Sequence, residues 1–69
     1  MEDHWIKIYS TSEFYRAELV KQLLFEHDIP AVIMNKQDSS YRFGHIEVWT
    51  HEDDKITASV LIEEMSETH

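Results

Sequence analysis

The chain has 69 residues, with 14 acidic against 6 basic side chains and a formal net charge of −8. An acidic surface repels phosphate backbones and anionic lipid, which argues against nucleic acid and membranes as partners. The length predicts a single domain over 1–69 with an ordered core at about 5–65. There is no cysteine and no run of apolar residues long enough to span a bilayer, so we expect a cytoplasmic protein without disulfides.

Residues 5–9 alternate between apolar and amphipathic side chains, which predicts a half-buried strand. Ile6 and Ile8 fall on one face of this strand. Trp5, Lys7 and Tyr9 fall on the other.

Residues 12–27 contain no Gly or Pro and predict a helix, with either Ser10 or Ser12 as its N-cap. Its buried stripe is expected to comprise Ala17, Val20, Leu23 and Leu24. Phe14 and Phe25 lie roughly opposite that stripe. Either they fold back onto neighbouring loops, or they form a contact surface.

Residues 31–35 follow Pro30 and predict a second strand, apolar on both faces. The segment 36–44 is polar, rich in turn-forming residues and holds the only glycine, so we expect a hairpin loop. Residues 45–51 then alternate strictly and predict a third strand. Ile46, Val48 and Thr50 form its inner face. Its outer face carries His45, Glu47, Trp49 and His51.

A second helix is predicted to begin at Thr50 or His51, because the acidic residues 52–54 complement the positive end of a helix. Its buried stripe is expected at Ala58, Leu61, Ile62 and Met65. Ile56 and Val60 are expected to widen this stripe.

The order strand, helix, strand, strand, helix predicts an α+β protein with the ferredoxin-like βαββα arrangement. A right-handed crossover leaves the first two strands parallel, and the third strand fills the gap between them in antiparallel orientation. The expected strand order is 2-3-1, with both helices on one face. The fourth strand of the complete fold is missing, which leaves the edge of strand 5–9 open.

The face of the sheet opposite the helices is expected to be uncovered. The residues assigned to this surface are Trp5, Lys7, Tyr9, His45, Glu47, Trp49 and His51, together with alternate residues of 31–35. Two Trp and a Tyr on one face exceed the apolar surface usual for a monomer. We therefore predict a non-enzymatic regulatory or protein-interaction module that forms a homodimer through this face or through the edge of strand 5–9. A different protein partner is the second possibility.

Several motifs resemble a family of small bacterial domains described as putative prokaryotic signal-transducing proteins and regarded as similar to the PII nitrogen regulators. The residues that carry the resemblance lie in 5–10, 17–24, 29–32, 35–39, 46–48 and 58–62. The resemblance implies a ferredoxin-like domain in a bacterium and no established activity. Asp28 stands where a glycine often closes the first helix of the family, and Asp adopts the left-handed conformation there at some cost.

The loop after the second strand is the candidate site for a small polar ligand or for a partner's backbone. Its residues are Asn35, Lys36, Gln37, Asp38, Ser39, Ser40 and Tyr41. The resemblance to PII regulators, which bind effectors near a long loop at this position, implies an effector sensor as an alternative function. The segment 35–44 is shorter than a PII loop and has no glycine-rich phosphate cradle. Alternatively, its Asn, Asp and Ser side chains satisfy their own turn amides.

Trp5, Tyr9 and Trp49 also resemble the aromatic platform on which RNA-recognition domains stack bases, so single-stranded RNA binding is a further alternative. The acidic charge of the chain argues against it. His45 and His51 are too far apart along one strand to share a metal ion, and we expect no metal site and no cofactor. No nucleophile–base pair or paired carboxylates with informative spacing are present, so we expect no enzymatic activity.

Overall fold

The computed structural model describes residues 4–36 and 45–67. Its elements are β1 (Trp5–Thr11), α1 (Phe14–Glu26), β2 (Ala31–Asn35), β3 (Ile46–His51), a short 3-10 helix η1 (Glu52–Asp54) and α2 (Lys55–Glu67). The strands form one sheet in the order β1-β3-β2, and β3 is antiparallel to both neighbours. The predicted α+β class, element order and strand order are therefore confirmed.

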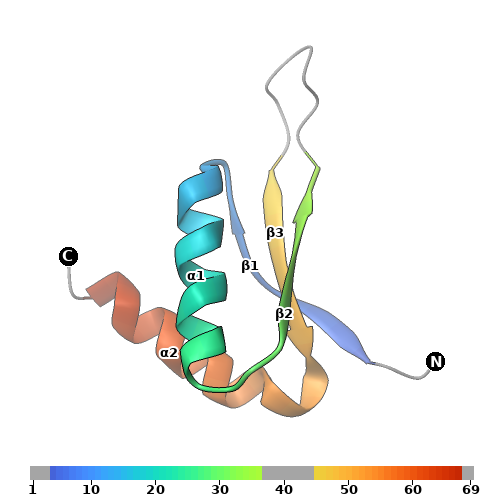
Figure 1. Cartoon of the computed structure of the whole chain (residues 1–69), viewed down its shortest axis with the longest axis vertical. Coiled ribbons are helices and arrows are strands. Elements are labelled where there is room, and N and C mark those ends of the chain that lie inside the picture. The colour runs from blue at the N-terminus through green and yellow to red at the C-terminus, as the bar shows by residue number, and fades with distance from the viewer. Residues whose placement is uncertain (1–3, 37–44, 68–69) are drawn as a thin grey trace.

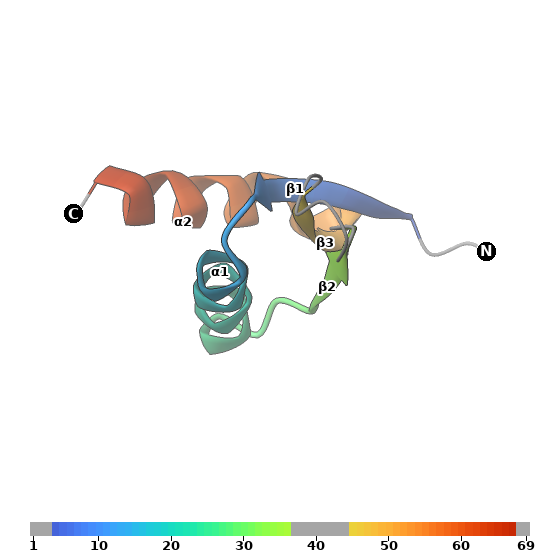
Figure 2. The same cartoon turned by 90° about the horizontal axis from the view of Figure 1, so that it is seen from above.

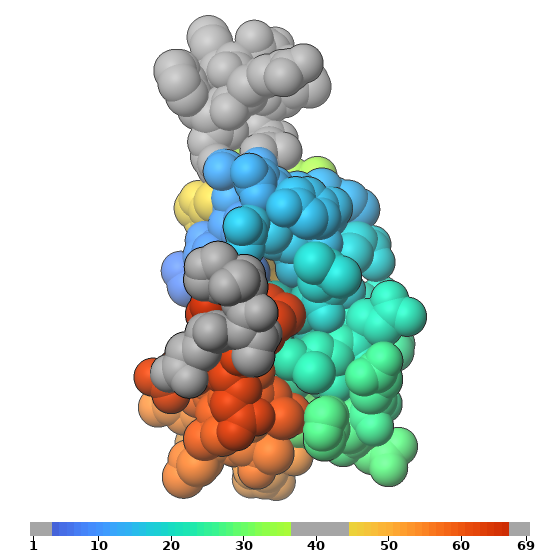
Figure 3. All heavy atoms as spheres, turned by 90° about the vertical axis from the view of Figure 1, so that its left-hand side faces the viewer, coloured from blue at the N-terminus to red at the C-terminus, as the bar shows by residue number. Residues whose placement is uncertain are grey.

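Both helices lie on the same side of the sheet (Figures 1 and 2). Viewed from that side, α1 and α2 lie next to each other (Figure 3), and the two helices are in contact. α1 packs against all three strands, and α2 packs against β1 and β3. Within the described residues, the opposite side of the sheet has no covering element.

The core forms between the helices and the inner face of the sheet. It contains residues from both helices, from β2 and β3, and from the segment before β2: Ala17, Val20, Leu24, Ile29, Ala31, Ile46, Val48, Ala58 and Ile62. Ile8, Tyr9, Ile33, Leu61 and Met65 pack around it and are partly buried. Both predicted helix stripes therefore supply core residues. The expectation that Ile56 and Val60 widen the second stripe is wrong, because Ile56 is 79% and Val60 46% exposed.

A β-bulge interrupts β1 and changes the predicted faces of that strand. Lys7 pairs with Trp49 and Tyr9 pairs with Val48, so Ile8 is the extra residue between them. After the bulge, the side chains of β1 project from the opposite faces of the sheet to those that simple alternation predicts. Tyr9 therefore shares the inner face with Val48 and packs against the core, and its assignment to the open face is wrong.

α1 starts later than expected, and its first turn uses a different arrangement from the predicted serine cap. Its N-cap is Glu13, which makes no capping hydrogen bond with its side chain. Instead the backbone N–H of Glu13 donates to Oγ1 of Thr11, and the Glu13 carboxylate accepts a 2.7 Å hydrogen bond from Nε of Arg16. The prediction of Ser10 or Ser12 as N-cap is therefore wrong.

The end of α1 has the geometry that the sequence predicted. Asp28 has φ of 60°, in the left-handed region. The N–H of Ile29 donates to the carbonyl of Leu24, and the N–H of Asp28 donates to the carbonyl of Phe25. These two bonds form a Schellman motif, which satisfies carbonyls left free at a helix end. Leu24 and Ile29 are both buried in the core, as this motif favours.

The second helix, expected to begin at Thr50 or His51, starts only at Lys55, because β3 continues to His51 and residues 52–54 form η1. Nδ1 of His51 accepts a hydrogen bond from the backbone N–H of Asp53, so this imidazole caps η1. The three acidic residues Glu52, Asp53 and Asp54 form η1, immediately before α2. On the inner face, the Thr50 hydroxyl donates a 2.6 Å hydrogen bond to the Pro30 carbonyl and holds the start of β2 against β3.

Candidate functional site

The open face of the sheet is defined by the register of the strands. Trp5 lies opposite His51, and Lys7 lies opposite Trp49. On the other side of β3, Val32 lies opposite Trp49 and Met34 opposite Glu47. Residues that face each other across a ladder project from the same side of the sheet. We define the open face by these residues together with His45 and Lys36, which contact Glu47.

Glu47 lies at the centre of the open face and is only 5% exposed, although no helix covers it. Its neighbours on the face bury it. Nε1 of Trp49 donates to Oε1 at 2.9 Å, and Nε2 of His45 lies 2.7 Å from Oε2. Because an ionised carboxylate only accepts, the His45 ring nitrogen is the donor. Both carboxylate oxygens are therefore hydrogen-bonded.

Two lysines complete the surroundings of Glu47. Nζ of Lys7 lies 3.7 Å from Oε2, and Nζ of Lys36 lies 3.7 Å from Oε1. Lys7 belongs to β1, Lys36 follows β2 and Glu47 belongs to β3, so one carboxylate links all three strands. The hydrogen bonds from Trp49 and His45, with the charges of the two lysines, lower the pKa of Glu47 from 4.5 to about 2. The carboxylate is therefore ionised at neutral pH.

Apolar surface surrounds this polar centre. Val32 is 47% and Met34 45% exposed along β2, and Trp5 and Trp49 are partly exposed. The Trp5 ring meets the His51 ring edge-on, with their centroids 6.1 Å apart. The open face thus combines a fixed polar core with an aromatic and aliphatic rim.

The structure places six of the seven predicted face residues together, all except Tyr9. By its pairing with Glu47, Ser10 takes the outward position that the sequence assigned to Tyr9. The sequence also assigned alternate residues of 31–35 to this face, and the structure identifies them as Val32 and Met34. Lys36 was not assigned to this face, because it lies beyond the predicted strand and its position depends on the contact with Glu47.

The candidate loop is only partly within the described residues. Asn35 ends β2, and Lys36 donates its backbone N–H to the carbonyl of His45 at 2.9 Å. Gln37, Asp38, Ser39, Ser40 and Tyr41 lie outside the described residues. The ligand site predicted there stays a prediction.

No group of three or more His, Cys, Asp or Glu side chains in 4–36 and 45–67 is arranged to hold a metal ion. No helix in these ranges is both long enough and apolar enough to cross a membrane.

A family described as "Putative prokaryotic signal transducing protein" matches residues 5–66, which include all three strands, α1 and nearly all of α2. The chain belongs to this family. The signal-transducing family was the one expected from the sequence motifs. Neither the curated proteins nor the solved structures contain a match to the chain.

Proposed function

We propose that this member of the signal-transducing family is a non-enzymatic protein-interaction module that self-associates through the open face of its sheet. The observation that carries the proposal is the position of Trp5 and Trp49, the only two tryptophans of the chain, on the face that both helices leave uncovered. Tryptophan is enriched in the buried centres of protein interfaces. A contact between two copies would bury both indoles.

The distribution of charge favours a second copy as the occupant of this face. With histidines neutral, the open face carries Lys7 and Lys36 against Glu47, a net charge of +1. Because the whole chain has a net charge of −8, the remaining residues together carry about −9. Two copies that meet through their open faces bring their least acidic surfaces together. Their acidic surfaces then point away from each other, which reduces repulsion.

The Glu47 network also prepares the face for binding. The Trp49 indole and the two lysine side chains are held by contacts to one buried carboxylate. Side chains that are already fixed lose less conformational entropy when a partner docks. The carboxylate itself keeps its hydrogen bonds in the complex, so its burial leaves no unpaired charge.

The size of the face agrees with this mode of association. A standard interface buries about 800 Å² on each partner, and the chain exposes 4994 Å². The interface therefore needs about a sixth of the surface of the chain, more than the edge of one short strand supplies. The open face is therefore favoured over the edge of β1, which the bulge at Ile8 also distorts.

Sedimentation velocity at micromolar concentrations tests the proposal. The double variant Trp5→Gln and Trp49→Gln removes both indoles, while the amide introduced at position 49 retains an N–H donor for Glu47. We expect this variant to sediment as a monomer. Met34→Gln is a milder variant on the same face, and Ile56→Gln is the matched control on exposed α2. A wild-type protein that stays monomeric, or a dimer that the double variant leaves intact, contradicts the proposal.

The other predictions from the sequence are separate from this proposal. Cytoplasmic location and similarity to the PII regulators stay predictions, as do the effector site at 35–44 and RNA binding through the tryptophans. The proposal does not depend on them.

A further inference from the structure

Within the described residues, β2 is the less protected of the two sheet edges. β1 carries Lys7 and the bulge at Ile8, two features that hinder pairing with another strand. The register between β2 and β3 runs without a shift from Ala31 to Asn35. This stretch contains no charged residue and no proline. An uncharged edge strand without a bulge is a template for strand addition.

The register shows which backbone groups of β2 point outward. The N–H of Lys36 donates to His45, so these residues form a hydrogen-bonded pair. Such pairs alternate along an antiparallel ladder, which directs the backbone groups of Met34 and Val32 toward β3. The N–H and carbonyl groups of Ala31 and Ile33 therefore face away from the sheet, where an added strand would pair with them.

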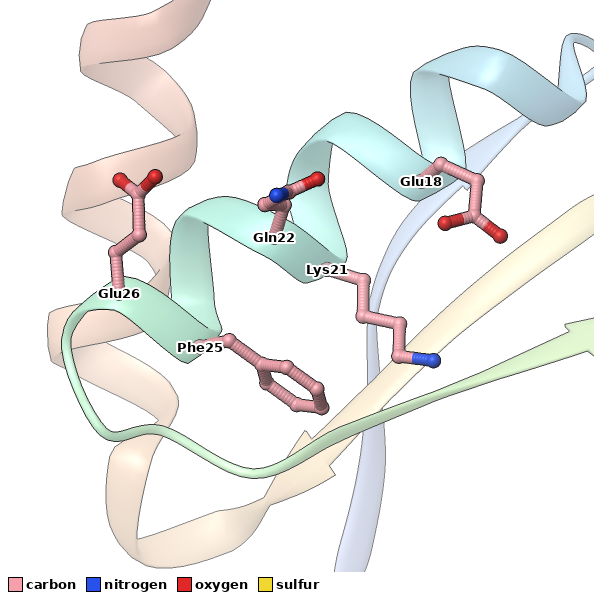
Figure 4. Close-up of a pocket in the computed structure, with 5 residues that line it drawn as sticks. All are labelled: Glu18, Lys21, Gln22, Phe25 and Glu26. Carbon is pink, nitrogen blue, oxygen red and sulfur yellow. The ribbon is translucent and has the colours of Figure 1, made fainter.

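α1 provides a wall beside this edge. A hollow of about 360 Å³ lies along α1 and is lined by Glu18, Lys21, Gln22, Phe25 and Glu26. Figure 4 shows the side chains of Phe25 and Lys21 directed from α1 toward the side on which β2 runs. Phe25 is 52% exposed, and Nζ of Lys21 lies 5.4 Å from the centroid of its ring. One row of side chains from an added strand would contact Phe25 and the neighbouring side chains of α1.

The negative charge around the hollow favours a bound strand with basic side chains. Glu18 and Glu26 outnumber Lys21, and the whole chain is strongly acidic. Pairing of β2 from two copies would bring two such acidic α1 surfaces close together, which disfavours a second copy. We propose that the β2 edge and the α1 hollow together bind an extended segment of another protein, in which basic residues alternate with aliphatic or aromatic ones. This surface borders the open face along β2 and includes neither tryptophan.

Nuclear magnetic resonance of the full ¹⁵N-labelled chain tests the proposal with three capped ten-residue peptides. The probe alternates lysine with valine and contains one tyrosine. One comparator has glutamate in place of lysine. The other keeps the lysines but carries backbone N-methyl groups on alternate residues, which prevents strand pairing. We expect the probe to slow hydrogen exchange of the Ile33 amide at least about tenfold and both comparators to bind at least about tenfold more weakly.

Variants connect the binding to the proposed groove. Phe25→Gln should weaken binding of the probe, while Ile56→Gln on α2 should not. Trp5→Gln with Trp49→Gln should leave peptide binding unchanged even where it abolishes self-association, so the two proposals fail separately. Absence of binding, equal binding of all three peptides, or binding without protection of Ile33 overturns the proposal. Protection of Ile33 that rises with protein concentration in the absence of peptide also overturns it, because a second copy would then occupy the edge.

Discussion

Glu47 shows how a single residue organises the surface of this small sheet. Its carboxylate lies on the side of the sheet without helices, yet the side chains of Trp49, His45, Lys7 and Lys36 bury it. The sequence predicted its face by simple alternation. It did not predict the burial, because that depends on Lys36 and Lys7 reaching the carboxylate from the two neighbouring strands.

The lowered pKa of Glu47 predicts a specific pH dependence of stability. A carboxyl group whose folded pKa lies below its unfolded value stabilises the fold above the unfolded pKa and loses that contribution as the pH falls through the folded pKa. For Glu47 the range is from about 4.5 down to about 2. We expect Glu47→Gln to melt below the wild type at pH 7, and the difference to shrink as the pH approaches 2.

Thermal unfolding by circular dichroism at a series of pH values measures this difference. Glu63→Gln, at an exposed carboxylate of α2, is the control and should follow the wild type at every pH. A difference between Glu47→Gln and the wild type that stays constant from pH 7 to pH 2 would contradict the role assigned to the carboxylate.

Asp28 allows a second prediction at a single residue. It occupies the left-handed position of the Schellman motif, where a residue with a Cβ is strained and glycine is not. We expect Asp28→Gly to stabilise the fold by about 1 kcal/mol, which for a chain of this size raises the melting temperature by about 4–8 °C. Asp28→Asn removes only the charge at the helix end. If the two variants gain equally, the charge rather than the backbone explains the effect.

At the scale of elements, the connection between α1 and β2 depends on Thr50. The hydroxyl of this buried residue bonds to the Pro30 carbonyl, just before β2 begins. Thr50→Val keeps the volume and the β-branched shape but removes the donor. We expect a loss of about 1 kcal/mol in the free energy of unfolding, measured by urea denaturation. Thr57→Val, on the exposed side of α2, should change it by less than about 0.5 kcal/mol.

The elements also show where sequence patterns are sufficient and where they fail. Hydrophobic periodicity located both helices and all three strands, because each element buries one face against the same core. Alternation predicted the wrong face for Tyr9 in β1, because it assumes a ladder without a bulge. The bulge at Ile8 depends on how β1 pairs with β3, and no local feature of residues 5–9 indicated it.

The prediction of where α1 starts was wrong for a related reason. Ser10 and Ser12 have the composition of an N-cap, but β1 continues to Thr11, and the helix begins only after the chain has left the sheet. The predicted outward faces of three residues are confirmed by the register. Trp5, Trp49 and Glu47 lie before or beyond the bulge, so their faces follow from alternation alone.

At the scale of the whole molecule, the two proposed surfaces differ in their response to salt. Two chains of −8 repel each other, so screening should strengthen self-association through the open face. A basic segment at the β2 edge is attracted by the acidic chain, so screening should weaken it. We expect the dimer dissociation constant to fall and the lysine peptide dissociation constant to rise between about 20 mM and 300 mM salt. Sedimentation and NMR titrations at the two salt concentrations measure these constants. A change of both in the same direction would contradict this assignment of surfaces.

Fluorescence quenching tests self-association through the open face most directly. Trp5 and Trp49 are the only tryptophans, and both lie on that face. Their accessibility to acrylamide therefore reports on this surface alone. We expect the quenching constant to fall as protein concentration rises through the range in which sedimentation shows a dimer. Quenching that stays constant while the dimer forms would place the interface elsewhere and contradict the central claim.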